Sequence, residues 1–142
     1  MTPEDTARAC AQAMWADDRA SQALGMEMTH IAPGTATLTM TVTEPMTNGH
    51  GTCHGGYLFT LADSAFAFAC NSHGPRVVAQ GASISFLAPG QLGDRLTATA
   101  REVHRAGRSG LYDVTVTRED GTVIAEFRGQ SRTIRGHHLE TE

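Results

Sequence analysis

The fold is decided by one stretch of the sequence, HGGYLFTLADSAFAFACNS over residues 54–72. Two glycines open this stretch and His73-Gly74-Pro75 follows it, which predicts a helix from about Gly55 to Ser72. Apolar side chains occupy nearly every face of the predicted helix. A helix that is hydrophobic all round is buried in the core. We therefore expect the rest of the chain to wrap around it.

Strands are predicted on both sides of this helix. Before it, four apolar residues alternate with five threonines over residues 35–43, a strict period of two that is typical of a strand. Pro33-Gly34 joins this strand to a shorter partner over residues 26–31. After the helix, we expect four strands near residues 77–87, 95–104, 110–118 and 122–133. Asp120-Gly121 is the hairpin signal between the last two.

The two ends of the chain complete the predicted α+β fold. Residues 3 to about 23 are rich in Ala and end at Gly25, which predicts an N-terminal helix. Residues 136–142 show no periodicity and are expected to form a mobile tail. No repeat or linker divides residues 1–142, so we expect one domain. A curved antiparallel sheet, ending in a four-strand meander, would wrap around the central helix. A single sheet leaves its edges uncovered, so we also expect an oligomer.

Composition excludes several classes of function. The net charge of −4 argues against a nucleic-acid binder, which usually has a basic face. All 11 basic residues are Arg, and the lack of Lys excludes a Schiff base and a Lys-dependent phosphate loop. No apolar run approaches the ~20 residues that a membrane helix needs. Three cysteines without a paired spacing, and a polar N-terminus without a signal peptide, predict a cytoplasmic protein.

Asp63 is out of place in the apolar central helix. A carboxylate there costs several kcal/mol unless it is paired or faces a cavity. The structural alternative is that Asp63 meets water or an arginine. Buried ionisable groups concentrate at functional sites, however, and this makes Asp63 the leading candidate for a catalytic residue.

Gly55 and Gly56 stand at the start of the same helix. The free N–H groups of a helix start, together with the helix dipole, could polarise a carbonyl, although the glycines could equally serve only the turn. Gly55 and Asp63 are eight residues apart, which is ~12 Å of helix rise. A carboxylate must lie within ~3 Å of the group that it activates. If both residues act, Gly55 of one subunit must face Asp63 of another.

Other readings of the polar residues are weaker. His50, Cys53 and His54 approach the spacing of zinc ligands, but no fourth ligand is evident and we expect no metal site. A Cys53–His54 nucleophile is disfavoured because neighbours in sequence rarely point together. Ser64 has no G-x-S-x-G context for a serine hydrolase.

The segment from Asn48 to Asp63 closely resembles the PaaI-type thioesterases, hot-dog enzymes of bacterial phenylacetate catabolism. The resemblance extends through residues 69–74 and 83–90 and covers roughly residues 20–135 in element order. It implies a hot-dog fold and hydrolysis of an acyl-CoA, an aryl-acetyl-CoA such as phenylacetyl- or hydroxyphenylacetyl-CoA, without a metal or redox cofactor. It also implies homodimers with shared active sites that pair into tetramers.

The resemblance carries roles onto matching positions. It makes Asp63 the nucleophile or the base, and the Gly55 N–H the group that polarises the thioester carbonyl. It places Asn48 where it positions the water or the carboxylate, and His54 beside the thioester. The expected substrate contacts are Phe59, Ser64, Pro89, Gly90, Arg108 and Ser109, with Arg108 meeting a CoA phosphate or remaining only a solvated charge.

Two rival functions remain open for this fold. A hot-dog acyl-CoA hydratase uses an Asp and a His five residues later, but Phe68 stands at that position. A non-catalytic acyl-CoA-binding protein is disfavoured because Asp63, Asn48 and Gly55 are all present. The sequence does not decide which acyl group is used, or whether Asp63 attacks carbon or deprotonates water.

Overall fold

A computed structural model describes residues 1–139 of the chain. Within these residues, three α-helices, one short 3-10 helix and six strands follow one another. In order, they are α1 (Pro3–Asp17), α2 (Arg19–Ala23), β1 (Glu27–Ala32), β2 (Thr35–Thr41), η1 (Glu44–Met46), α3 (Gly55–Cys70), β3 (Pro75–Phe86), β4 (Arg95–Ala106), β5 (Ser109–Thr117) and β6 (Val123–His137).

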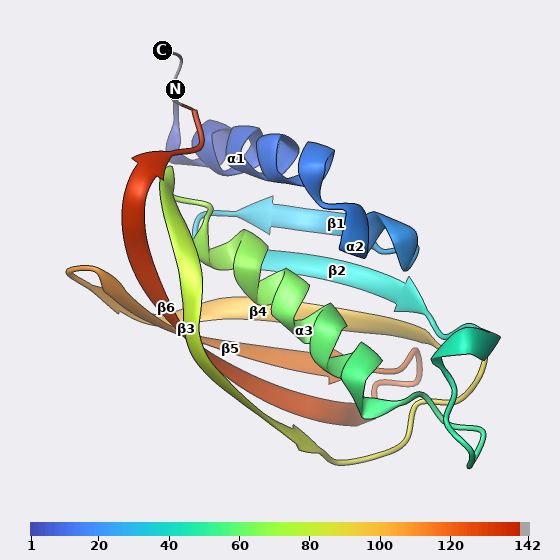
Figure 1. The fold of residues 1–142 in the computed structure, drawn as a ribbon. Coiled ribbons are helices and arrows are strands. Elements are labelled where there is room, and N and C mark those ends of the chain that lie inside the picture. Colours follow the sequence, from blue (N-terminus) through green and yellow to red (C-terminus); the bar gives the residue numbers. More distant parts are fainter. Residues whose placement is uncertain (140–142) are drawn as a thin grey trace.

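The strands form one antiparallel sheet in the order β1-β2-β4-β5-β6-β3. Figure 1 shows this sheet curving around α3, with α1 beside β1 and β3 at the opposite edge. The structure confirms the predicted hot-dog architecture. The expected four-strand meander is wrong for β3, which pairs with β6 at the edge and not with β4. Residues 87–94 instead carry the chain across to β4, so that the sheet can close around the helix.

The core lies between α3 and the concave face of the sheet. Leu61, Ala62 and Ala65 are fully buried, and the Phe66 ring packs against Tyr112 and Phe127 of the sheet. Gly129 of β6 makes this contact possible, because a Cβ there would lie 2.8 Å from the Phe66 ring. Burying one aromatic side chain in this way contributes about 3–5 kcal/mol relative to Ala.

The predicted N-terminal helix is broken into two pieces. α1 ends at Asp17, and Asp18 then caps α2 by accepting a hydrogen bond from the Ser21 N–H at 3.0 Å. The carboxylate of an aspartate competes with backbone carbonyls for backbone N–H donors. Aspartate is therefore favoured at helix caps over helix interiors. The break turns the chain towards β1.

The end of β6 also differs from the expectation. The strand runs to His137, past the predicted end at residue 133, and His138 contacts the Asn71 side chain at 2.6 Å. Residues 136–138 thus belong to the sheet and its packing. The rest of the expected tail, residues 140–142, lies outside the described residues.

Candidate active site

Asp63 is half-buried on α3, as its place in the apolar helix predicted. Among residues 1–139, no group donates a hydrogen bond to its carboxylate. Burial raises the pKa of Asp63 above its usual value, because the charged form is poorly solvated. A carboxylate with this environment is more basic than an exposed one and is free to act on a bound group.

The Asp63 carboxylate opens onto a cavity of about 360 Å³. We call this the Asp63 cavity. Its walls come from α3, from the first half of β3, from the end of β6 and from α1, and they are mostly apolar. Residues that face it include Met14, Phe66, Cys70, Arg76, Val78 and Ile134. An apolar cavity with one carboxylate suits an acyl group whose carbonyl reaches that carboxylate.

Gly55 is the first residue of α3, and its N–H finds no acceptor within the described part of the chain. The next N–H, that of Gly56, is taken by the Nδ1 atom of His54 at 2.9 Å. Gly55 therefore presents a backbone N–H donor at this helix end without an acceptor in residues 1–139. It lies at the positive end of the helix dipole, where an oxyanion is stabilised.

A second cavity, of about 480 Å³, borders Gly55. We call this the Gly55 cavity. Leu58 of α3, Phe86 at the end of β3 and residues 87–89 after the strand are among the residues that line it. The Phe86 ring lies so close that a Cβ on Gly55 would meet its Cζ atom at 2.9 Å. The predicted contact Pro89 also faces this cavity. The next residue, Gly90, is buried, and its carbonyl accepts from the Cys53 N–H at 2.7 Å.

Asn48 and His54 shape the loop that leads into α3. The Asn48 Oδ1 atom accepts from the N–H groups of His50 and Thr52, at 2.9 and 3.2 Å, and its Nδ2 donates to the Thr52 hydroxyl at 3.0 Å. His54 is exposed, caps Gly56 and lies edge-on to Tyr57. Within one chain, both residues lie at the Gly55 end of α3.

The predicted site residues fall into two groups within one chain. Gly55, Asn48, His54, Pro89 and Gly90 gather at the amino end of α3. Asp63 lies two turns further along, on a different cavity. Figure 1 shows the loop before α3 at one end of the sheet and the β4–β5 hairpin at the other. The structure does not bring the two groups together in a single subunit.

The remaining predicted contacts have other positions. The Phe59 ring packs edge-on against Phe127 at 5.3 Å between centroids, and Ser64 hydrogen-bonds to the Ser21 hydroxyl at 2.8 Å. Arg108 and Ser109 lie at the exposed tip of the β4–β5 hairpin. Ser109 faces Arg132 near the end of β6, whereas Phe86 faces Ala125 near its start. The hairpin therefore belongs to the Asp63 end of the sheet.

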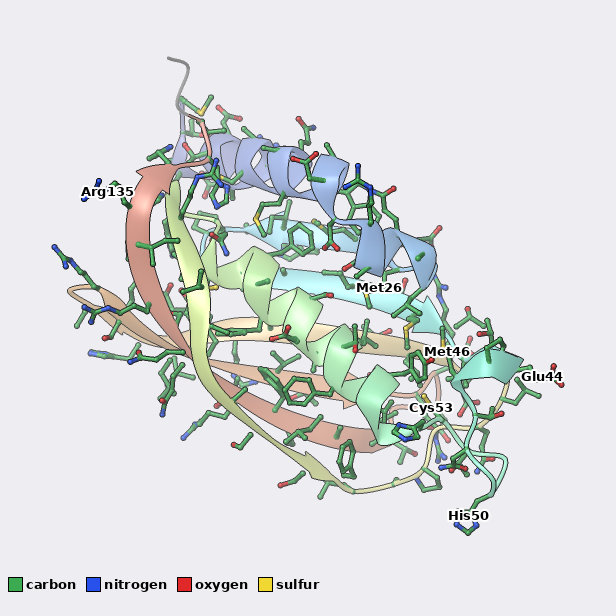
Figure 2. The ribbon with its side chains drawn as sticks, viewed as in Figure 1. Met26, Glu44, Met46, His50, Cys53 and Arg135 are labelled. Carbon is green, nitrogen blue, oxygen red and sulfur yellow. The ribbon has the colours of Figure 1, made fainter. Side chains whose placement is uncertain are left out.

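The alternative chemistries gain no support from the geometry. Figure 2 shows His50 at the outer tip of its loop, pointing away from the protein and apart from Cys53. Within residues 1–139, no group of three His, Cys, Asp or Glu side chains could hold a metal ion. Burial raises the pKa of the Cys53 thiol to about 11, which keeps it protonated and a poor nucleophile. Phe68 is buried and packs against Trp15, so it offers no acid or base.

Sequence reasoning missed several residues that line the Asp63 cavity. Met14 belongs to the N-terminal helix, which carried no predicted role, and His138 lay in the expected tail. Arg76 is the second residue of β3 and has no motif around it. Ala7, Cys10 and Met14 recur at helical spacing on one face of α1, and this pattern could have predicted that Met14 faces the interior. No comparable pattern marked Arg76 or His138.

Comparison with known proteins identifies the family. The model of the thioesterase superfamily matches residues 50–125, which include Gly55 and Asp63. The acyl-coenzyme A thioesterase PaaI of Escherichia coli is 48% identical over 126 residues, which cover 89% of this chain and 90% of that protein. The chain therefore belongs to the thioesterase superfamily, and it is a hot-dog thioesterase of the PaaI type.

Solved structures support the same assignment. The structure of the E. coli PaaI protein, from the phenylacetic acid degradation operon, matches 96% of this chain and 99% of its own with a TM-score of 0.94 and 45% identity. A hypothetical thioesterase protein of Streptococcus pneumoniae, solved with coenzyme A, matches 76% of this chain and 87% of its own with a TM-score of 0.74 and 30% identity. The resemblance seen in the sequence and the expected enzyme class are confirmed.

No helix in the described part of the chain is long and apolar enough to cross a bilayer.

Proposed function

We propose that this enzyme hydrolyses an aryl-acetyl-CoA, of the phenylacetyl or hydroxyphenylacetyl type, at a site shared by two subunits. Asp63 acts from one subunit, and the Gly55 N–H of the other polarises the thioester carbonyl. The observation that carries this proposal is the separation of the two groups. They stand ~12 Å apart along one helix and open onto different cavities, so neither cavity alone holds both.

The outer edge of β3 supplies a way to join the two cavities. Within residues 1–139, no strand pairs with this edge, and Val78, Phe86 and Leu87 lie 44%, 55% and 59% exposed along it. A long, partly apolar edge is a ready surface for association. The start of β3 borders the Asp63 cavity, and its end borders the Gly55 cavity.

Antiparallel pairing of β3 with its copy would bring the right groups together. In a two-fold pair, the start of one strand lies against the end of the other. The Asp63 cavity of one subunit then meets the Gly55 cavity of its partner, twice in each dimer. We further propose that such dimers pair into tetramers, as the family resemblance implies.

The chemistry needs only these groups. Asp63, made more basic by its burial, either removes a proton from water as that water attacks the carbonyl carbon or attacks that carbon itself to give an anhydride that water then cleaves. In both routes negative charge develops on the carbonyl oxygen, beside the Gly55 N–H and the positive end of α3. The carbon–sulfur bond breaks, CoA leaves as a thiolate, and the carboxylic acid remains.

The substrate class rests on the cavity and on a relative. The Asp63 cavity is largely apolar and large enough for an aromatic ring. The E. coli PaaI protein comes from a phenylacetic acid degradation operon.

We place the CoA arm between Pro89 and Gly90 of one subunit and Arg108 and Ser109 of the other, since β3 pairing brings these ends of the two sheets to the same side. The three free cysteines suit a reducing, cytoplasmic setting.

Replacing Gly55 tests the oxyanion role. Gly55→Pro removes the Gly55 N–H. Proline is tolerated at the first position of a helix, and His54 already has the extended backbone that a following proline requires. Gly55→Ala adds the same Cβ beside Phe86 but keeps the N–H, and it is the matched control. We expect Gly55→Pro to lower kcat about 100-fold relative to Gly55→Ala. Equal activities would contradict the role of this N–H.

Mixed dimers test the shared site. One subunit carries Asp63→Asn and the other Gly55→Pro, so one of the two sites in the mixed dimer combines an intact Asp63 with an intact Gly55. We expect about half the wild-type activity from purified mixed dimers, although both parent homodimers are nearly inactive. Mixed dimers as inactive as their parents would show that each site lies within one subunit.

A further inference from the structure

The N-terminal helix reaches the proposed acyl cavity through one side chain. Ala7, Cys10 and Ala11 are buried on one face of α1, and Met14 continues that face one turn further. Met14 is half-buried and lines the Asp63 cavity. Among the residues that line it in the described chain, Met14 alone comes from a segment before α3. The helix thus forms one wall of the cavity.

Two contacts, one from α1 and one from α2, hold the N-terminal segment against α3. The Trp15 ring, next to Met14, packs against Phe68 with 6.1 Å between ring centroids. Beyond α1, the Ser21 hydroxyl donates to Asp18 at 2.7 Å and lies 2.8 Å from the Ser64 hydroxyl. Because the only hydroxyl proton of Ser21 goes to Asp18, Ser64 is the donor in the second bond.

This hydrogen-bond chain ends beside the catalytic position. Ser64 follows Asp63 on α3, so the chain Ser64–Ser21–Asp18 ties the N-terminal segment to the helix one residue from the carboxylate. The segment is buried there, since Ser21 is 1% exposed. The position of Met14 relative to Asp63 is therefore set by packing on one side and by hydrogen bonds on the other.

We propose that Met14 sets the size of the acyl group that the Asp63 cavity accepts. This inference rests on the proposed function and adds a specificity-determining residue to it. The unbranched thioether of Met14 adapts to irregular shapes, and its sulfur packs favourably against an aromatic ring. It closes the cavity against acyl groups larger than one ring and contacts a single ring that fits.

Variants of Met14 test this role through substrate preference. Met14→Ala removes the wall, and we expect the ratio of kcat/KM for 2-naphthylacetyl-CoA to that for phenylacetyl-CoA to rise about 10-fold or more. Met14→Trp should instead lower kcat/KM for phenylacetyl-CoA while leaving acetyl-CoA nearly unaffected. Met14→Leu, which conserves volume, should keep the wild-type profile and shows that the position tolerates replacement.

Met28→Ala is the matched control. Met28 is also half-buried and lies where α1 meets β1, but it lines a different groove. We expect its substrate ratio to match the wild type. Folded, active Met14→Ala with an unchanged ratio, or an equal change in Met28→Ala, would overturn the proposal.

If the proposed function is wrong, the CoA-release assay gives a result that differs from a failure of the Met14 inference. In that case the wild-type enzyme would release no CoA from any of these thioesters. The role of Met14 is then judged by calorimetric binding of the free acids 2-naphthylacetate and phenylacetate. The inference requires Met14→Ala to gain affinity for the larger acid relative to the smaller one, and no relative gain overturns it.

Discussion

Asp63 and Glu102 are both half-buried carboxylates, yet their surroundings are opposite. Asp63 faces a cavity and accepts no hydrogen bond from residues 1–139, and burial raises its pKa. Burial alone would also raise the pKa of Glu102, but the hydrogen bonds from His73 and Tyr112 outweigh it, and the net pKa is lowered. A carboxylate surrounded by donors stabilises the fold, whereas a half-buried one without donors is a candidate for the catalytic group.

Removing the charge of Asp63 should have the largest effect. We expect Asp63→Asn to lower kcat by about 1,000-fold or more, because it removes either the base or the nucleophile. Its thermal stability at pH 7 should equal or exceed that of the wild type, since a poorly solvated charge is gone. Free CoA release and calorimetric unfolding measure the two effects.

The exposed Asp17 provides the control for this variant. Asp17→Asn should change neither activity nor stability measurably. Near-normal turnover by Asp63→Asn would refute the assignment of Asp63 as the catalytic carboxylate.

Removing Glu102 should show the opposite pattern. Glu102→Ala leaves the hydroxyl of Tyr112, a residue only 1% exposed, without its acceptor at 2.8 Å. We expect the free energy of unfolding to fall by about 2 kcal/mol, with kcat/KM close to the wild type. Glu126 is exposed and, within the described chain, accepts hydrogen bonds from Thr115 alone, so Glu126→Ala should cost no more than about 0.5 kcal/mol. Loss of turnover in folded Glu102→Ala would show that the two carboxylates are functionally linked.

Lowering the pH should affect stability in opposite directions through Glu102 and Asp63. The folded pKa of Glu102 lies below its unfolded value of 4.5, so its stabilisation is present above pH 4.5 and is lost as the pH falls through the folded pKa. The folded pKa of Asp63 lies above its unfolded value of 3.8, so protonation of Asp63 favours the folded state on acidification. Unfolding measured from pH 3 to 7 should show a smaller acid loss in Glu102→Ala than in the wild type. An unchanged acid loss would mean that Glu102 is not its source.

Tyr112 should give the smallest effect. Tyr112→Phe keeps the ring against Phe66 and removes only the hydroxyl, while His73 still donates to Glu102. We expect a loss of about 1 kcal/mol in denaturant unfolding and no change in substrate preference. A loss as large as that of Glu102→Ala would assign most of the stabilisation to this one hydrogen bond.

Much of the fold could be read from local pattern. The strict alternation over residues 35–43 predicted β2, and the apolar run after Gly55 predicted α3 within two residues of its end. The position of β3 could not be read, because pairing with β6 instead of β4 depends on contacts between distant segments. The cap formed by Asp18 was missed because a single residue decides between one helix and two.

For the site, the sequence by itself determined that Asp63 is a charged residue in an apolar, buried helix and that Gly55 starts that helix. Both conclusions follow from residue type and helix geometry, which depend only on residues close together in the sequence. Only the tertiary structure decided that Asp63 and Gly55 open onto separate cavities, that Ser64 binds Ser21, that no donor reaches Asp63 within residues 1–139, and that Met14 lines the same cavity as Asp63. These relations join segments far apart in the chain, and their geometry is set by how the sheet curves and where α1 packs, which no local pattern encodes.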